Sequence, residues 1–177
     1  MDYFQFYDIP LTFYPDQNLV KKKFYALSKE YHPDFFANET AEKQNEILEL
    51  STLNNKAFQI LSHPDKLLAY VLTLKGVLIE GEKYTLPQDF LMEMMEVNED
   101  LMELEFEANE KQVNKVTAEV DSLEEGLNQE LKSCTKQFTE TNSAQQESIL
   151  QEIKDIWYRK KYLLRIRESI DKFATRL

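Results

Sequence analysis

Glycine and proline are scarce in this chain, which has three and five of them among 177 residues. Sheets joined by tight turns need more of both, whereas helices tolerate the scarcity. The single cysteine, Cys134, excludes an internal disulfide and a zinc site built from several cysteines. No apolar run could span a membrane, and no basic flank of a signal peptide opens the chain. We therefore expect an almost wholly helical, all-α protein in the cytoplasm.

An excess of basic residues is missing too, because 32 acids outweigh 21 bases and leave a net charge of −11. This balance argues against nucleic acid or an anionic membrane as the main partner. The acids are concentrated, since Lys83 is the one base between Glu80 and Glu110. A glycine-rich phosphate loop is also absent, so we expect no bound nucleotide. We also expect no other cofactor and no metal site.

The stretch Tyr31-His32-Pro33-Asp34 is the centre of the first half, since it separates two predicted helices, 16–31 and 41–61. Pro33 has no backbone N–H to donate and disfavours helical geometry at His32. The result is a rigid corner that presents an imidazole and a carboxylate. We interpret it as a recognition tip, because nothing nearby in sequence supplies a nucleophile or a third group to orient the pair.

The first of these helices combines a buried stripe with a cluster of lysines. Val20, Phe24 and Leu27 recur at helical spacing and form the stripe. The lysines fall largely on other faces and are Lys21, Lys22, Lys23 and Lys29. Taken alone, they indicate a solvated helix surface; beside the corner, they become candidates for partner binding.

A second copy of the tripeptide follows at His63-Pro64-Asp65, before the strongly helical stretch 66–74. Proline suits the first turn of a helix, and an aspartate suits its positive end. No run of lysines precedes this copy. We therefore interpret it as a junction between two helices.

The second half begins after segment 76–86, which contains two of the three glycines and no apolar periodicity. Apolar stripes then predict three long helices, over 86–108, 110–138 and 144–174. Such helices bury their stripes best as an antiparallel three-helix bundle. Cys134 lies on one stripe, which favours a small core residue over a reactive thiol. The expected organisation is a first domain at 1–75, a linker at 76–86 and a bundle at 87–177.

The first helix of the bundle carries more apolar residues than one stripe needs. Its ordinary core stripe consists of Phe90, Met94, Val97, Leu101 and Leu104. A second set lies well off that stripe and consists of Leu91, Met92, Met95 and Met102. A helix buried on two sides and an exposed, adaptable protein-binding patch both fit this pattern. Tyr158 and Tyr162 of the last helix point away from its stripe, so we expect two exposed tyrosines there, which are either incidental or an extension of such a patch.

The first half resembles the J-domain, the module by which DnaJ-type co-chaperones stimulate Hsp70. The similarity rests on Asp2-Tyr3-Phe4, on the basic helix with its His-Pro-Asp corner, and on Asn55-Lys56-Ala57-Phe58-Gln59-Ile60-Leu61. With a linker and a bundle opened by Phe90-Leu91-Met92-Glu93, nearly the whole chain resembles the HscB family, the J-proteins of iron–sulfur cluster assembly.

The resemblance implies a two-ended adaptor that activates a partner's ATPase and is not itself an enzyme. His32, Pro33, Asp34 and the four lysines would dock on an HscA- or DnaK-like Hsp70, where Asp34 would meet an arginine. The bundle would hold an IscU-type scaffold and would bind no cluster itself. The scaffold-facing residues implied are Leu91, Met92, Met95, Glu96, Glu99, Glu103 and Tyr162.

One departure and three rival hypotheses accompany this resemblance. Many J-domains carry Lys or Arg where this chain has Phe35, which bears on the charge contact with the chaperone. A general DnaJ-type co-chaperone for unfolded clients is the first rival, although the Gly/Phe-rich or cysteine-rich regions usual in such proteins are missing. An enzyme using His32 and Asp34 as acid and base is the second, with no visible nucleophile or cleft. A structural helical protein with an accidental tripeptide is the third.

Overall fold

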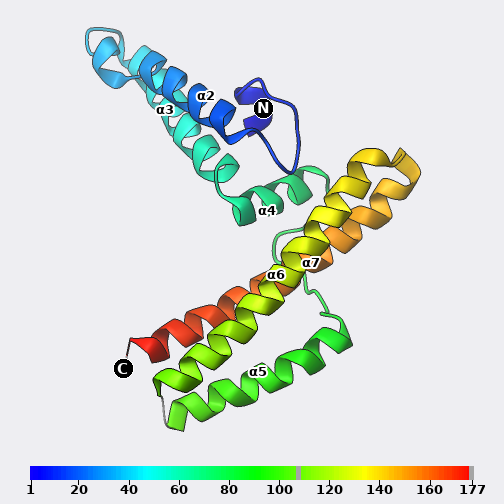
Figure 1. Cartoon of the computed structure of the whole chain (residues 1–177). Helices are drawn as coiled ribbons and strands as arrows, with labels where there is room; N and C mark the ends of the chain where they lie inside the picture. The colour runs from blue at the N-terminus through cyan, green and yellow to red at the C-terminus, as the bar shows by residue number, and fades with distance from the viewer. Residues whose placement is uncertain (107–108, 176–177) are drawn as a thin grey trace. The chain divides into compact units, whose positions relative to one another are not determined.

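The computed structural model describes residues 1–106 and 109–175, and every regular element within them is a helix (Figure 1). The chain divides into two compact units, Met1–Gly76 and Val77–Leu177. The prediction of an all-α protein is confirmed. Within the described residues, no helix is both long enough and apolar enough to cross a membrane.

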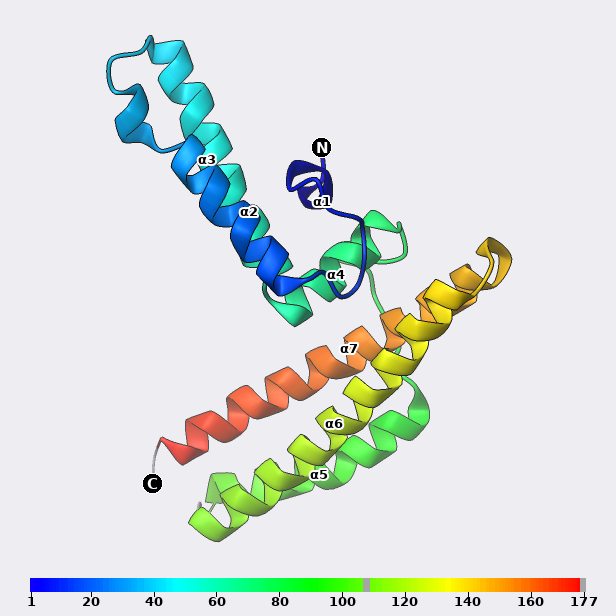
Figure 2. The ribbon, with the colours of Figure 1, turned by 45° about the horizontal axis from the view of Figure 1, so that its top comes forward.

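The N-terminal unit is built on a helical hairpin, as Figures 1 and 2 show. Its elements are α1 (Tyr3–Phe6), α2 (Gln17–Glu30), the short 3-10 helix η1 (Pro33–Phe36), α3 (Ala41–Leu61) and α4 (Pro64–Leu74). The helices α2 and α3 lie side by side, and η1 lies at the end of the hairpin away from α4. The hairpin therefore carries the first tripeptide at its tip.

The ends of these helices follow from local chemistry. The Asp16 carboxylate accepts hydrogen bonds from the first N–H groups of α2, and the Thr40 hydroxyl accepts one from Lys43 N. Pro64 occupies the first position of α4, so the second tripeptide is the helix junction that the sequence predicted. Gly76 ends this helical run in a left-handed conformation, φ 75°, which glycine adopts at little cost.

A buried amide ties the hairpin to α1. The Tyr7 hydroxyl donates to Asn54 Oδ1 over 2.9 Å, and Asn54 Nδ2 donates to the carbonyl of Phe24 and the hydroxyl of Ser28. Both Tyr7 and Asn54 are buried, and a buried polar group left without a partner costs about 1–3 kcal/mol. This network therefore holds α1, α2 and α3 in one register.

The C-terminal unit consists of α5 (Gln88–Phe106), α6 (Glu110–Glu140) and α7 (Ser143–Ala174). The long helices α6 and α7 run antiparallel, and the shorter α5 packs along the part of them that is remote from their connecting turn (Figure 2). The first helix begins two residues later than expected, and its predicted end at position 108 lies outside the described residues. The turn between α6 and α7 is shorter than expected, because helical geometry continues through Glu140.

The core of this unit is formed by one stripe from each helix. Its most buried members include Met94, Val97, Val120, Ile156 and Leu163. Burying one such side chain stabilises a fold by about 1.5–3 kcal/mol. The three apolar stripes read from the sequence are therefore the surfaces on which the bundle closes.

Candidate functional site

The His-Pro-Asp corner is held by bonds within its own few residues. His32 caps η1, because its Nδ1 accepts a hydrogen bond of 3.3 Å from Asp34 N. The carboxylate of Asp34 lies 3.7 Å from the same nitrogen, and its side chain is 86% exposed. The Phe35 ring is exposed and tilted against the His32 ring, with centroids 5.6 Å apart. The corner thus presents a carboxylate, an imidazole and an aromatic ring to solvent.

A glutamine from α3 braces the loop that follows the corner. Gln44 Nε2 donates to the carbonyls of Ala37 and Glu39 over 3.1 and 3.0 Å. In the second tripeptide, by contrast, the His63 side chain makes no capping hydrogen bond, and Pro64-Asp65 are the first turn of α4. The two copies therefore have different structures: one is an exposed corner and the other is a helix start.

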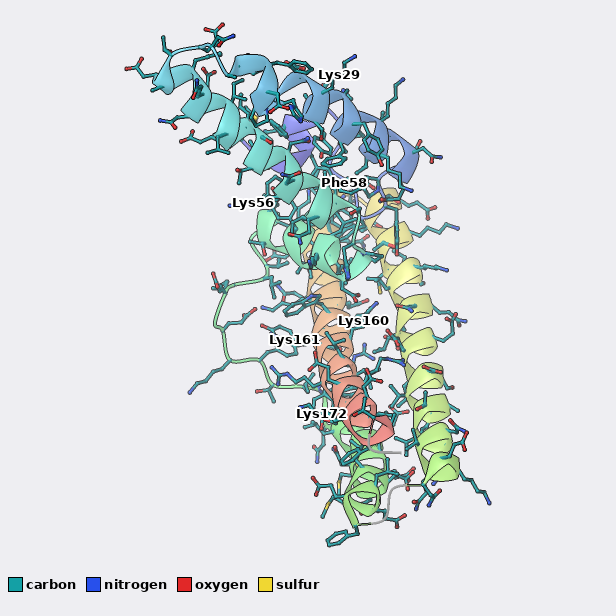
Figure 3. All side chains as sticks on the ribbon, turned by 90° about the vertical axis from the view of Figure 1, so that its left-hand side faces the viewer. Lys29, Lys56, Phe58, Lys160, Lys161 and Lys172 are labelled. Carbon is teal, nitrogen blue, oxygen red and sulfur yellow. The ribbon has the colours of Figure 1, made fainter. Side chains whose placement is uncertain are left out.

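The lysines of α2 do not form one uniform surface. Lys22 and Lys29 are exposed and lie two turns apart, on the side of α2 opposite the buried Val20. Figure 3 shows Lys29 in its place on the hairpin. Lys23 is less exposed, and its ammonium lies 3.6 Å from the Asp8 carboxylate. Lys21 is exposed on a flank, so Lys21, Lys22 and Lys29 are the more accessible basic groups.

The second apolar set of α5 lies on the surface of its unit. Leu91, Met92 and Met95 are 40%, 61% and 60% exposed, whereas Met94 is fully buried. Within its own unit, α5 is therefore buried on one side only. Methionine is flexible and polarizable, and it suits surfaces that adapt to another protein.

The rim of this face is acidic. Glu96, Glu99 and Glu103 are all exposed, and α5 contains seven acids and no base. Polar side chains of α6 reach this helix: Gln112 Nε2 donates to Glu103 over 3.2 Å, and Lys115 forms an ion pair of 2.9 Å with Asp100. The face therefore combines apolar groups with a strong negative charge.

Tyr162 lies beside this face but is half-buried, so the expectation of an exposed tyrosine is wrong. Its hydroxyl accepts a hydrogen bond of 3.0 Å from Asn98 Nδ2, and its ring meets the Phe90 ring edge to face, with centroids 5.7 Å apart. Tyr162 therefore packs α7 against α5 and supports the exposed face from one side. Tyr158 is also half-buried.

The segment before α5 is attached to α7 by a cluster that we call the clasp, formed by Glu82, Tyr84 and Leu86. The Tyr84 ring stacks on Tyr158, and Leu86 packs against the core. Lys154 Nζ and the Tyr158 hydroxyl both donate to Glu82, over 2.7 and 3.0 Å. Segment 76–86 is therefore not a free linker over its whole length.

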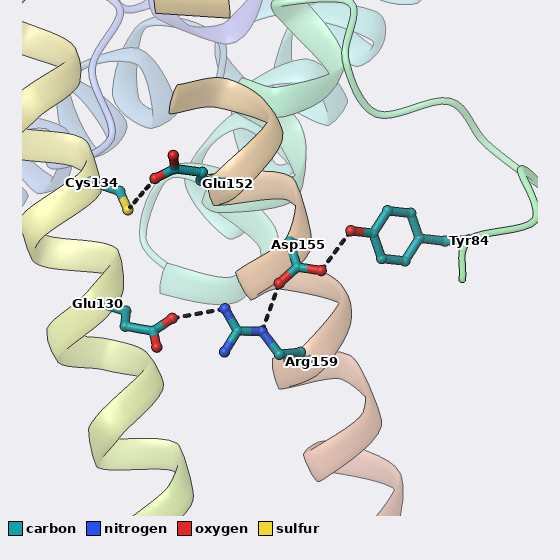
Figure 4. Close-up of polar contacts among 6 residues, drawn as sticks. All are labelled: Tyr84, Glu130, Cys134, Glu152, Asp155 and Arg159. Carbon is teal, nitrogen blue, oxygen red and sulfur yellow. Dashed lines mark hydrogen bonds and ion pairs between the residues drawn. The ribbon is translucent and has the colours of Figure 1, made fainter. Parts of the chain in front are cut away.

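A series of polar contacts connects the clasp to α6 and α7 (Figure 4). The Tyr84 hydroxyl donates to Asp155 over 2.6 Å, Arg159 Nε donates to the same carboxylate over 2.8 Å, and Arg159 also pairs with Glu130 over 2.7 Å. Burial and this carboxylate raise the pKa of Tyr84. The hydrogen bond from Lys154 lowers the pKa of Glu82, while burial and Glu82 raise the pKa of Tyr158 to about 12.

The sequence analysis missed the clasp, although one signal was present. Tyr158 lies off the apolar stripe of its helix, and an amphipathic ring placed there needs both an apolar neighbour and a hydrogen-bond partner. Cys134, in contrast, behaves as predicted: it is partly buried on the core, and burial together with Glu152 raises the pKa of its thiol. No group of three or more potential metal-binding side chains converges anywhere in residues 1–106 and 109–175.

Comparison with known proteins identifies the family of the chain. The family model described as the HscB C-terminal oligomerisation domain matches residues 86–171. The human iron–sulfur cluster co-chaperone protein HscB is 30% identical over 171 residues, which cover 96% of this chain and 67% of the human protein. The chain belongs to the HscB family.

Two Vibrio HscB proteins and the crystal structure of human HscB extend the comparison. The co-chaperone protein HscB homolog of Vibrio parahaemolyticus is 34% identical over 105 residues, covering 59% of this chain and 61% of its own length. The crystal structure of human HscB has a TM-score of 0.82 at 26% identity, covering 100% of this chain and 84% of that one. HscB from Vibrio cholerae shares the fold, with a TM-score of 0.65 at 24% identity.

Proposed function

We propose that this HscB-family chain is a co-chaperone that stimulates the ATPase of an HscA- or DnaK-like Hsp70 and delivers an IscU-type iron–sulfur scaffold to it. In this role the N-terminal unit binds the chaperone and the C-terminal unit binds the scaffold. The ATP hydrolysis takes place in the Hsp70, so the chain is an activator and not the enzyme.

The observation that carries this proposal is the exposed His-Pro-Asp corner at the tip of a hairpin with exposed lysines. A fixed carboxylate at such a tip suits an arginine on the chaperone, because a charge-assisted hydrogen bond to guanidinium is strong and directional. Lys22 and Lys29 suit an acidic surface and would speed encounter with it. Phe35 adds an exposed ring to this contact where many J-domains have a basic residue.

The scaffold-binding half of the proposal rests on the α5 face. Leu91, Met92 and Met95 are exposed without serving the core, and an apolar surface with an acidic rim suits a partner with a basic rim. Membership in the family of the human iron–sulfur cluster co-chaperone supports an iron–sulfur scaffold as this partner. Glu96, Glu99 and Glu103 would then steer the scaffold and fix its register.

One ATPase assay tests both halves. The steady-state hydrolysis rate of an HscA- or DnaK-like Hsp70 is measured alone, with this chain, and with this chain plus an IscU-type scaffold. We expect the chain alone to raise the rate and the scaffold to raise it further. No stimulation by the folded chain would overturn the proposal. Equal enhancement by the scaffold and by a permanently unfolded client would instead indicate a general DnaJ-type co-chaperone.

The compartment belongs to the same proposal. A chain that serves iron–sulfur assembly has to meet its chaperone and scaffold, and we infer the cytoplasm as that place. Fractionation of cells followed by immunodetection of the chain and of its Hsp70 partner tests this inference. Recovery of the chain in another compartment would overturn it and would leave the activity proposed above unchanged.

A further inference from the structure

The exposed apolar face of α5 does not end at Met95. Met102 and Phe106 are 60% and 89% exposed, and both lie on the same helix. Met102 follows Met95 by seven residues and Phe106 follows it by eleven. At 3.6 residues per turn, both side chains therefore leave the helix within about 20° of the direction of Met95. The resemblance to known relatives assigned no role to either residue.

We propose that Met102 and Phe106 form a second apolar anchor for the iron–sulfur scaffold, so that the docking face of α5 has two parts. The first anchor consists of Leu91, Met92 and Met95. This inference rests on the proposed scaffold-binding function and adds a specificity-determining contact to it. Phe106 is the largest exposed side chain of this face, and large aromatic groups carry much of the energy of protein interfaces.

A polar turn separates the two anchors. Asn98 is half-buried there, with its amide bonded to the Tyr162 hydroxyl, so it is held at the α7 side of the helix. Glu99 is exposed between the anchors. A matching partner surface has two apolar clusters separated by a lysine or arginine, with the clusters about 10 Å apart for seven residues of helix. This spacing defines the chemistry of the partner more closely than one apolar patch does.

The dimensions of the face support two anchors over one. At 1.5 Å per residue, Leu91 to Met95 spans about 6 Å of helix, whereas Leu91 to Phe106 spans about 22 Å. A stable interface covers about 800 Å² on each partner, which corresponds to a patch roughly 28 Å across. The first anchor alone is much shorter than this, and the whole helix face is close to it.

Charge favours a basic scaffold over a second copy of this chain. A two-fold dimer through this face would place the α5 acids of one copy against those of the other, since such interfaces are isologous. The helix has seven acids and no base of its own, and the ion pair between Lys115 of α6 and Asp100 still leaves it strongly negative. A scaffold with basic residues around apolar contacts meets the same face with attraction.

Calorimetric titration with a purified IscU-type scaffold tests the proposal. Three variants are compared with the parent chain. The first is the pair Met102→Ala and Phe106→Ala, and the second is the triple change Leu91→Ala, Met92→Ala and Met95→Ala. The third, Leu164→Ala, is a control that shortens an exposed side chain on α7. We expect the first pair to raise the Kd at least tenfold and Leu164→Ala to change it less than twofold. All three should melt like the parent chain, because exposed side chains leave no cavity when they are shortened.

A photo-cross-link gives a second measurement that does not depend on truncation. The chain carrying Phe106→benzoylphenylalanine is irradiated with the scaffold, and the product masses are determined. A heterodimeric product supports the proposal. A homodimeric product overturns it and shows that a second copy occupies the face.

The two levels of the proposal fail differently. If the Met102/Phe106 pair binds the scaffold within twofold of the parent while the Leu91/Met92/Met95 variant does not bind, the second anchor is wrong and scaffold binding stands. If the parent chain itself does not bind the scaffold, the scaffold half of the proposed function is wrong as well.

Discussion

The ring of Tyr84 stacks on the ring of Tyr158, with centroids 4.1 Å apart and planes 2° from parallel. The two hydroxyls point to different carboxylates, Asp155 for Tyr84 and Glu82 for Tyr158. One aromatic contact thus joins the segment before α5 to the last helix. The stack and its two hydrogen bonds make separate contributions, which substitutions can distinguish.

Replacing Tyr84 with alanine should lower the free energy of unfolding of the C-terminal unit by about 1–2 kcal/mol, because an aromatic pair adds about 0.5–1.5 kcal/mol to the burial of its rings. Tyr84→Phe should have a smaller effect, since it keeps the stack and loses only the bond to Asp155. Urea unfolding followed by the fluorescence of Trp157, the single tryptophan, measures both. Equal losses for both variants would mean that the hydrogen bond, and not the stack, holds the clasp.

The Glu82–Lys154 pair should make the clasp sensitive to acid. The folded pKa of Glu82 lies below its ordinary value of 4.5, mainly because Lys154 donates to it. Its stabilising effect is therefore complete above that value and disappears as the pH falls through the folded pKa. Urea unfolding of the parent and of Glu82→Gln between pH 7 and pH 3 should give a difference in stability that narrows as the pH falls. A constant difference across this range would contradict the linkage.

Matched substitutions in the two tripeptides should separate their roles. Asp34→Asn should abolish stimulation of the Hsp70 ATPase, whereas Asp65→Asn should leave it nearly intact, because Asp65 lies in the first turn of α4. Asp34→Asn should lose no more than about 0.5 kcal/mol of stability, as is usual for an exposed side chain. If both variants lost stimulation equally in the ATPase assay, with unchanged circular dichroism, the assignment of this function to the first tripeptide alone would be wrong.

The lysines of α2 should differ in their effect on association with the chaperone. Reversing Lys22 and Lys29 to glutamate should slow association roughly tenfold at low ionic strength and flatten its salt dependence, since rim charges act mainly on the association rate. Lys23→Glu should act less, because Asp8 already lies beside that ammonium. Stopped-flow association with the Hsp70 at two salt concentrations measures these rates. An unchanged salt dependence in the double variant would indicate that these lysines are only a solvated helix surface and do not bind the chaperone.

Two neighbouring methionines should respond in opposite ways to the same substitution. Met94 is fully buried and Met95 is 60% exposed. Met94→Ala should therefore cost about 2–5 kcal/mol through the cavity it leaves, while Met95→Ala should stay within about 0.5 kcal/mol. Thermal melts measure stability, and titration with the scaffold should show a loss of affinity for Met95→Ala. A stable Met94→Ala variant would contradict the position of the core stripe.

Much of this structure follows from local sequence. The bounds of α3 and the start of α4 were predictable because Thr40 and Pro64 are strong helix-start signals, and their effect depends on neighbours within one turn. The stripe of Met94 and Val97 identified the core face of α5 for the same reason. Sequence alone left the exposure of Met92 and Met95 open, because periodicity shows that two faces are apolar but not how many neighbours cover them.

The partners within the clasp were beyond local reasoning, although the position of Tyr158 off its stripe was a local signal. Tyr84 lies 71 residues from Asp155, and Glu82 lies 76 residues from Tyr158. Contacts at such separations depend on how all the helices of the bundle pack together. Segment 76–86 has no helical or strand periodicity of apolar residues that would predict them. The same limit applies to Tyr162, whose burial is decided by Asn98 and Phe90 on another helix.

The absence of basic residues from α5 has a consequence for how salt acts on this chain. Carboxylates that lie three or four positions apart, such as Glu96, Glu99 and Glu103, repel one another along the helix. Dissolved ions weaken that repulsion and so favour the helix, yet they also weaken its attraction for a basic partner. Raising the ionic strength therefore stabilises the α5 helix but lowers its affinity for a basic partner. The helix binds such a partner most tightly at low salt, where repulsion among its own carboxylates is strongest.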